Sequence, residues 1–392
     1  MLLPREPDSS PLSVLHAVQP GDGGVARVVA DLVRDQLRAG MRVTVACPPG
    51  TPLAADVRTE GADVYAWRAG RDPGPRLVRE TIDLARLIRT TGPDLVHAHS
   101  AKAGLCARLA LRGARPTVYQ PHAWSFEAVE GTVAALARRW ERRAARWTHR
   151  VVCVSEAERR TGEEAGVRAS WSVIHNGVDL ARFADTPAGT PTPADTGTGT
   201  ATDTGDGPVV VCVGRLCRQK GQDVLLAAWP AVLAEVPTAR LVLVGDGPDG
   251  DRLRAAAGPS VRFTGSVDDT APWYRAADVV VLPSRWEGMA LAPLEAMASS
   301  RPVVVSDVDG ARESLPPAHE PLCLVPPEDP AALATALGRL LGERELRHRL
   351  GREAHEHVLN RFDVRRTGAA VADVYRELAG VRGTEHREPI AQ

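Results

Sequence analysis

Short apolar runs rich in valine alternate with helix-like runs along almost the whole chain, and this alternation limits the fold more than any other feature. In the first half, strand-like runs lie at Ser13–Val18, Arg42–Cys47, Asp63–Trp67, Leu95–His99, Thr117–Gln120, Val151–Ser155 and Ser172–His175. In the second half they lie at Pro208–Val213, Arg240–Val244, Val261–Thr264, Asp278–Leu282 and Pro302–Val305. Helix-like patterns such as Ala26–Arg38 and Arg76–Thr90 separate most of them. The alternation predicts an α/β protein whose parallel sheets carry helices on both faces.

One segment interrupts the alternation. Asp185–Gly207 is rich in Thr, Pro, Ala, Gly and Asp and contains no aromatic and no large aliphatic residue. Such a segment cannot bury a core, which predicts a flexible linker or a disordered insertion. At 392 residues the chain is long enough for two domains with separate cores. We therefore predict Rossmann-like domains at residues 1–183 and 208–361, a linker at 184–207, a last helix at 362–380 and a tail at 381–392.

The charge balance argues against a nucleic-acid partner. The formal net charge is −1, although residues 1–183 carry 26 Lys and Arg against 20 Asp and Glu. Two interpretations of this excess remain open. The first half meets an anionic acceptor or membrane surface, or its charges are simply solvated.

Cysteine usage and apolar runs indicate the compartment. The six cysteines form no Cys-x2-Cys pair, and most lie in apolar runs, which is typical of core residues in a reducing compartment. The first residues, 1–6, contain no apolar signal core. No run approaches the roughly 20 apolar residues that a membrane-spanning helix needs. We expect a cytoplasmic protein, or one bound peripherally at the inner face of the membrane.

The most informative short segment is Glu287–Glu295, in which seven residues separate two glutamates. The first glutamate follows a strand-like run and stands beside Gly288 in a loop, and the second lies within the helix-like segment Ala292–Ser299. Free backbone N–H groups at a helix start suit an anion. A carboxylate further along the helix can accept hydrogen bonds from a sugar diol. The segment therefore predicts a site for a phosphate and a sugar together.

A second segment, Val211–Gly221, adds positive charge after a strand. Gly214 permits a tight turn. Arg215 offers a bidentate fork and Lys220 a point charge, so the two side chains can neutralise a diphosphate and stabilise it as a leaving group.

A glycine-rich turn, Gly21-Asp22-Gly23-Gly24, follows the first strand. Its glycines let a backbone approach a ligand closely. It departs from Gly-x-Gly-x-x-Gly at Ala26, and the second strand ends at Cys47 without an acidic residue. A dinucleotide cofactor is therefore poorly supported.

Together, these segments resemble the donor site of GT-B glycosyltransferases, especially the retaining enzymes of family 4. The resemblance rests on Glu-x7-Glu, on Val211–Gly221 and on Leu241–Val244 with its turn Gly245–Pro248, and it covers nearly the whole chain. It implies two Rossmann-like domains facing an interdomain cleft, with a C-terminal helix, Phe362–Leu378, that crosses back onto the first domain. It also implies a nucleotide-sugar donor as co-substrate, no cofactor, and a glycan, lipid-linked or small-molecule acceptor. The resemblance implies transfer with retention, and the paired cations Arg215 and Lys220 argue against a required metal.

The resemblance assigns roles to individual residues. At the reacting centre it implies His122, Arg215, Lys220 and Glu287. For donor binding it implies Gly23, Gly24, Gly245, Val267, Met289, Ala290, Leu291 and Glu295, with Glu295 on the ribose hydroxyls and Glu287 against the transferred sugar. Many relatives have glycine where this chain has Ala123 and Ala290. Because alanine avoids positive φ more strictly than glycine, we expect the path of the loop at Ala290 to be affected.

Two basic segments concern the acceptor. His97 and His99 alternate on a strand and share a face, but a metal would need a third ligand, and the sequence places no suitable cluster beside them. The surrounding His-x-His-Ser-x-Lys-Ala-Gly resembles transferases that extend lipid-linked or polymer glycans, which implies that Lys102 contacts an acceptor phosphate. Arg138–Arg150 contains six arginines, and its two tryptophans are spaced for one helical face. That helix either lies on anionic lipid or packs its tryptophans into the core.

Two alternatives to transfer stay open at this point. A nucleotide-sugar 2-epimerase would have the same double-Rossmann layout and acid/base carboxylates in the cleft. A non-catalytic nucleotide-sugar-binding homologue would explain the alanines in the two loops.

Overall fold

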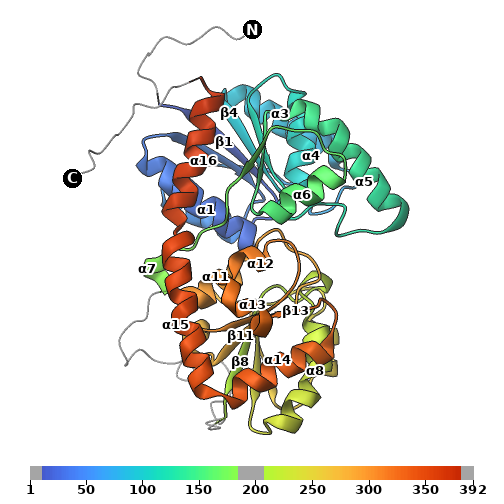
Figure 1. Cartoon of the computed structure of the whole chain (residues 1–392). Helices are drawn as coiled ribbons and strands as arrows, with labels where there is room; N and C mark the ends of the chain where they lie inside the picture. Colours follow the sequence, from blue (N-terminus) through green and yellow to red (C-terminus); the bar gives the residue numbers. More distant parts are fainter. Residues whose placement is uncertain (1–10, 184–206, 381–392) are drawn as a thin grey trace, which may run out of the picture.

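The computed structural model describes residues 11–183 and 207–380, and these form two α/β domains, one above the other in Figure 1. The N-terminal domain contains a seven-stranded sheet in the order β3-β2-β1-β4-β5-β6-β7. All of its strands are parallel. They are β1 (Ser13–Val18), β2 (Arg42–Cys47), β3 (Asp63–Ala66), β4 (Leu95–His99), β5 (Thr117–Gln120), β6 (Arg150–Cys153) and β7 (Trp171–Val173).

The C-terminal domain repeats the arrangement with a six-stranded parallel sheet in the order β10-β9-β8-β11-β12-β13. Its strands are β8 (Val209–Val213), β9 (Arg240–Val244), β10 (Val261–Gly265), β11 (Val279–Leu282), β12 (Val303–Ser306) and β13 (Leu324–Val325). In each sheet the strand order reverses beside the first strand, between β1 and β4 and between β8 and β11. Open α/β sheets bind ligands outside the carboxyl ends of the strands at such a point.

Helices connect the strands and cover the sheets. Those of the N-terminal domain are α1 (Gly23–Arg38), α2 (Pro52–Thr59), α3 (Leu77–Thr91), α4 (Ser100–Leu111), α5 (Gly131–Ala144), α6 (Glu156–Glu164) and the short α7 (Leu180–Phe183). Those of the C-terminal domain are α8 (Gln222–Glu235), α9 (Gly250–Ala256), α10 (Ala271–Ala276), α11 (Leu291–Ala298), α12 (Ala311–Ser314), α13 (Glu320–Cys323), α14 (Pro330–Gly342) and α15 (Arg344–Arg361).

The last helix, α16 (Val364–Leu378), leaves the C-terminal domain and packs on α1 of the N-terminal domain. Figure 1 shows α15 and α16 running along one side of both domains. Val178 forms a backbone bridge with Asp363, so the segment that leaves the first domain lies beside the segment that returns to it. The predicted double-Rossmann architecture with a returning helix is confirmed.

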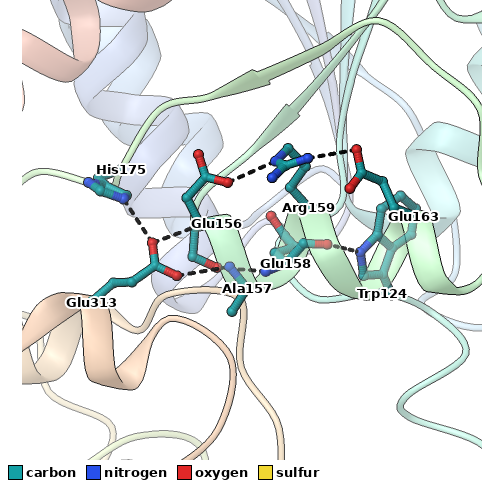
Figure 2. Close-up of polar contacts among 9 residues, drawn as sticks. Trp124, Glu156, Ala157, Glu158, Arg159, Glu163, His175 and Glu313 are labelled. Carbon is teal, nitrogen blue, oxygen red and sulfur yellow. Dashed lines mark hydrogen bonds and ion pairs between the residues drawn. The ribbon is translucent and has the colours of Figure 1, made fainter.

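The two domains also contact each other through Glu313, whose polar contacts are drawn in Figure 2. Its carboxylate accepts hydrogen bonds from the backbone N–H groups of Glu156 and Ala157, both 2.8 Å, at the start of α6 (Figure 2). It lies 3.1 Å from Nε2 of His175. Burial raises the pKa of Glu313, but the bonds from His175 and the two N–H groups outweigh burial and leave this pKa below its usual value. A carboxylate from one domain therefore caps a helix of the other.

Some predicted boundaries were wrong. The strands expected at Val151–Ser155 and Ser172–His175 begin and end earlier, and β13 was not predicted. The helix expected through Arg138–Arg150 ends at Ala144, and a short 3-10 turn leads into β6. The predicted linker falls outside the described residues except for Gly207. Across the described ranges, none of the helices has the length and apolarity that crossing a membrane requires.

Candidate active site

A cavity of about 850 Å³ lies between the two domains at the carboxyl ends of both sheets. Residues after β1 and β5 line it from the N-terminal domain, and residues after β8, β9 and β11 line it from the C-terminal domain. Most of the predicted site residues line this one cavity: Gly23, Gly24, His122, Arg215, Lys220, Gly245, Val267, Glu287, Met289, Ala290 and Leu291. Two sequence-predicted residues, Glu295 and Lys102, do not line it.

The turn after β8 supplies the positive charge. The Lys220 ammonium lies 2.5 Å from Oε1 of Glu287, which also accepts a hydrogen bond of 2.7 Å from the Ser284 hydroxyl. Arg215 is exposed toward the cavity, and its guanidinium has no ion-pair partner among the described residues. The predicted pair of cations is therefore present, with one cation balanced by Glu287 and the other available for an anion.

Gly245 lets the turns after β8 and β9 approach closely. Its φ of 134° lies in a region that favours glycine, and an added Cβ would stand 2.2 Å from the carbonyl oxygen of Gly214. No larger residue fits without moving the Gly214–Arg215 turn, so Gly245 holds the positively charged turn in place.

The loop before α11 is held by the other domain. The Ser155 hydroxyl donates to the carbonyl of Gly288 at 3.0 Å, and the Asn176 amide donates to the carbonyl of Met289 at 2.7 Å. Ala290 caps α11 with a φ of −71°, an ordinary value for alanine. The expected effect of alanine at this position is therefore absent. The first N–H groups of α11 have no acceptor within the helix and can bind an anion.

In the loop after β5, by contrast, the alanine at position 123 has an unfavourable backbone conformation. His122 and Ala123 have φ values of 56° and 88°, in the left-handed region. Left-handed conformations cost a non-glycine residue about 1–2 kcal/mol. The buried carboxylate of Glu158 stabilises this turn, since it accepts the N–H of Ala123 at 2.6 Å and that of Val154 at 2.7 Å. Burial raises the pKa of Glu158 to about 7, against the effect of these two bonds.

Behind His122 the structure assembles a buried histidine cluster. His122 Nε2 lies 3.2 Å from His99 Nδ1, and His99 Nε2 lies 2.9 Å from Nδ1 of His16. His16, His97 and His99 place one ring nitrogen each within 4.8 Å of the others. The prediction that no third ligand stands beside His97 and His99 is therefore wrong. His16 was missed because it lies on β1, whose place next to β4 is decided by the sheet order.

Lys102 lies in the interior of the N-terminal domain and not in the cavity, where the sequence motif suggested a contact with the acceptor. Its side chain is 2% exposed, pairs with Glu80 at 2.7 Å and donates to the carbonyl of Asp72 at 2.9 Å. The helix α4 turns it into the interior of the domain, so this placement does not support a contact with an acceptor phosphate.

Glu295 lies one helical turn beyond Leu291, in a small neighbouring pocket that Leu291 also lines. The Tyr274 hydroxyl donates to it at 2.7 Å. Burial raises the pKa of Glu295, against the effect of this hydrogen bond. Its proposed contact with a ribose stays a prediction.

Two further residues line the cavity that sequence reasoning missed. Asn176 follows β7 in an Asn-Gly pair, a turn signal that marked the position without indicating a role. Arg71 forms an ion pair of 3.0 Å with Asp22, a residue of the glycine-rich turn. It lies in a loop without a motif, and no sequence signal identified it.

Comparison with known proteins agrees with the geometry. Residues 22–182 match the family described as Glycosyltransferase Family 4, and residues 207–343 match Glycosyl transferases group 1. The chain is 32% identical to D-inositol 3-phosphate glycosyltransferase 2 of Catenulispora acidiphila, over 96% of this chain and 95% of that protein. It is 32% identical to phosphatidyl-myo-inositol mannosyltransferase of Mycolicibacterium smegmatis, over 76% of this chain and 76% of that protein.

Among solved structures, Anabaena Alr3699/HepE in complex with UDP and glucose superimposes with a TM-score of 0.78, at 23% identity, over 93% of this chain and 99% of that one. The fold and the site thus define a GT-B glycosyltransferase. The chain belongs to glycosyltransferase family 4.

Proposed function

We propose that this glycosyltransferase moves a sugar from a nucleotide-sugar donor to an acceptor bound by the N-terminal domain, with retention of the anomeric configuration and without a required metal ion. The observation that carries the proposal is that a single cavity brings Arg215, Lys220 and the start of α11 together, with His122 facing them from the other domain. That the HepE structure carries UDP and glucose agrees with a nucleotide-sugar donor.

The C-terminal domain is suited to the donor diphosphate. Arg215 and Lys220 after β8 and the N–H groups at the start of α11 provide positive charge at this cavity without a metal. Such fixed charges stabilise a diphosphate most when it departs and its negative charge grows. Glu287 orients the Lys220 ammonium, and its remaining oxygen faces the region of the donor sugar in this proposal.

Retention follows from the chemistry proposed for the cavity. The bond between the anomeric carbon and the phosphate oxygen breaks, and the acceptor oxygen bonds to that carbon on the same face. The acceptor proton passes to the departing phosphate, so no protein base is needed. Glu287 already interacts with Lys220 and Ser284, an arrangement that favours a structural and electrostatic role over a nucleophilic one.

The acceptor in this proposal carries a phosphate. The two relatives described above are named for an inositol phosphate and a phosphatidylinositol acceptor. With Lys102 buried, Arg71 is the cation that the N-terminal domain places in the lining of this cavity among the described residues. A phosphate at this position would displace the Asp22 carboxylate from the Arg71 guanidinium.

A lipid-linked acceptor would bring the protein to a membrane surface. On α5, Val133 and Leu136 are 57% and 68% exposed, and Arg139 and Arg143 follow them at helical spacing and are also exposed. Trp140 and Trp147 are half-buried with ring centroids 6.1 Å apart, so they stabilise the end of the helix. An exposed apolar pair beside arginines suits an anionic bilayer. Reversal of Arg139, Arg143 and Arg146 to glutamate should abolish sedimentation with anionic vesicles and leave donor binding unchanged.

The test of the function is product analysis with a panel of nucleotide sugars and inositol phosphate acceptors, in the presence of EDTA. We expect one donor to give a glycoside whose anomeric configuration, read by NMR, is that of the donor. An inverted product, or loss of activity restored by a divalent cation, would refute the corresponding part of the proposal. A C2-epimer of the donor would indicate an epimerase, and tight donor binding with no turnover would indicate a binding protein. The named relatives favour neither alternative.

A further inference from the structure

A chain of buried hydrogen bonds leads from the cavity to helix α1. It begins at His122, passes through His99 and His16 and ends at Gln36 of α1. His16 and His99 are fully buried and Gln36 is 1% exposed. The three contacts measure 3.2, 2.9 and 2.8 Å. Residues from β1, β4, α1 and the loop after β5 thus form one connected network.

We propose that Gln36 is a positioning residue that sets the imidazole tautomer of His122 through His16 and His99, so that His122 presents an unprotonated Nδ1 to the cavity as a hydrogen-bond acceptor for a hydroxyl of the donor sugar. The identity of the ligand rests on the proposed function. The tautomer rests on the network alone.

The direction of each bond follows from the first. The amide oxygen of Gln36 can only accept, so Nε2 of His16 carries a hydrogen. A neutral imidazole has one N–H, which leaves Nδ1 of His16 as an acceptor for the N–H of His99 at Nε2. His99 Nδ1 is then an acceptor for Nε2–H of His122. His122 Nδ1 remains unprotonated and is the nitrogen that can accept from a ligand.

These bond directions require neutral imidazole rings, and burial keeps the rings neutral. Burial lowers the pKa of His16 to about 4, with a smaller opposing effect of the Gln36 hydrogen bond, and lowers the pKa of His122 to about 3. It also holds the pKa values of His97 and His99 well below their usual range, helped by the neighbouring histidines. At neutral pH each ring therefore carries a single N–H.

A second branch holds the Gln36 amide in this orientation. Its Nε2 donates to the hydroxyl of Tyr375 on the returning helix α16, at 3.5 Å. Because that hydroxyl accepts from Gln36, its own hydrogen points to Nδ1 of His97, 2.5 Å away. All five bonds are thus consistent with one direction, and the returning helix is part of the network.

The same cluster could be read as a site for a divalent cation. His16 and His99 already share their facing nitrogens in a hydrogen bond, and Tyr375 occupies Nδ1 of His97. A divalent cation bound by the three rings would have to displace hydrogen bonds that they already make. The contacts therefore favour a hydrogen-bonded histidine network over a metal site.

The tautomer can be observed directly by nitrogen NMR of the full-length protein labelled with ¹⁵N-histidine. His122→Asn identifies the His122 signals by their loss. We expect the wild-type ring to be protonated at Nε2 and not at Nδ1. Gln36→Met removes the terminal acceptor and should mix the two tautomers, whereas Gln36→Glu keeps an acceptor of the same length and should preserve the wild-type tautomer.

Three results would overturn the inference. They are a wild-type His122 protonated at Nδ1, a tautomer that Gln36→Met leaves unchanged, and a joint shift of the His16, His97 and His99 signals on addition of one equivalent of zinc. The wild-type measurement decides the first even if Gln36→Met does not fold.

Steady-state kinetics of the Gln36 variants tests whether the His122 tautomer affects binding of the donor sugar. Loss of one hydrogen bond should lower kcat/KM of Gln36→Met for the donor about five- to tenfold, with recovery in Gln36→Glu. That deficit should vanish with a deoxy donor lacking the hydroxyl that His122 binds. An equal deficit with every deoxy donor would refute the contact. If the protein has no transferase activity but His122 shows the expected tautomer, the proposed function fails and the network stands.

Discussion

The two domains share a parallel-sheet topology but differ in what their sheets bury. In the N-terminal domain the strands at the reversal point carry His16, His97 and His99, and the surrounding helices bury the ion pairs Arg108–Glu141 and Lys102–Glu80. In the C-terminal domain β8, β11 and β12 are almost entirely valine, and the buried glutamates of its site, Glu287 and Glu295, come from the loop and helix after β11.

This difference indicates a division of labour. The C-terminal domain uses an apolar sheet as a rigid platform and binds through turns, glycines and a helix start, which require little from the core. The N-terminal domain supports its cavity-facing residues from inside, through buried polar groups that are costly to leave without a partner. Substitutions behind the cavity should therefore be more harmful in the N-terminal domain.

The largest expected effect concerns the buried pair Lys102–Glu80. Lys102→Met leaves the Glu80 carboxylate buried without its cation and should lower the free energy of unfolding by about 3–5 kcal/mol, measured by urea denaturation. Lys102→Met combined with Glu80→Leu should recover most of this loss and retain transferase activity. A stable double variant without activity would show instead that Lys102 contacts the acceptor.

The next effect belongs to the C-terminal domain and concerns rate. Lys220→Ala should lower kcat/KM about 100-fold, the scale for loss of one charge that stabilises a leaving group, with little change in the melting temperature. The matched control is Arg218→Ala in the same turn, since Arg218 is exposed and pairs with Glu130 at the surface. Similar losses in both variants would mean that the turn matters through its overall charge and not through Lys220.

The lowered pKa of His16 should make the free energy of unfolding depend on pH. Unfolded His16 binds a proton near pH 6.5, but the folded protein binds it only near pH 4, so stability is full above pH 6.5 and falls as the pH drops toward 4. One such group contributes a slope of about 1.4 kcal/mol per pH unit.

Buried acids oppose this slope, because burial raises the pKa of Asp31 to about 7, of Glu127 to about 8 and of Glu158 to about 7. The quantity to measure is therefore the difference in unfolding free energy between the wild type and His16→Gln at pH 7, 6, 5 and 4. It should shrink toward acid pH by about 1.4 kcal/mol per unit below pH 6.5. A difference that is constant with pH would show that His16 is protonated in the folded protein as easily as in the unfolded chain.

The smallest effect compares the two alanines of the cavity loops. Ala123→Gly relieves a left-handed backbone and should raise stability by about 0.5 kcal/mol after the entropy cost of glycine. Ala290→Gly has no strain to relieve and should lower stability by about 0.5–1 kcal/mol. Thermal unfolding of the two variants gives opposite shifts if the comparison holds. Shifts of the same sign would mean that the strain at Ala123 is not what distinguishes the loops.

The sequence by itself determined the parallel α/β class and the two domains, and its resemblance to family 4 transferases named most of the site residues that line the cavity. The fold class could be predicted because periodicity encodes strands and helices, and the edge that carries the site because the carboxyl ends of parallel strands meet there. Lys220 and Glu287 follow neighbouring strands, so their predicted proximity required only that β8 and β11 be adjacent. The glycine turns and the loop before α11 were likewise local signals.

Only the tertiary structure decided the contacts between side chains from distant elements. His16 joins His99 across 83 residues, and Tyr375 reaches His97 across 278. Lys102 follows the same strand as these histidines, yet the orientation of α4 turns it toward Glu80 and away from the cavity. Nothing in the periodicity of one element specifies which partner a polar side chain meets on another. That choice depends on sheet order, on helix packing and on the need of every buried polar group for a partner.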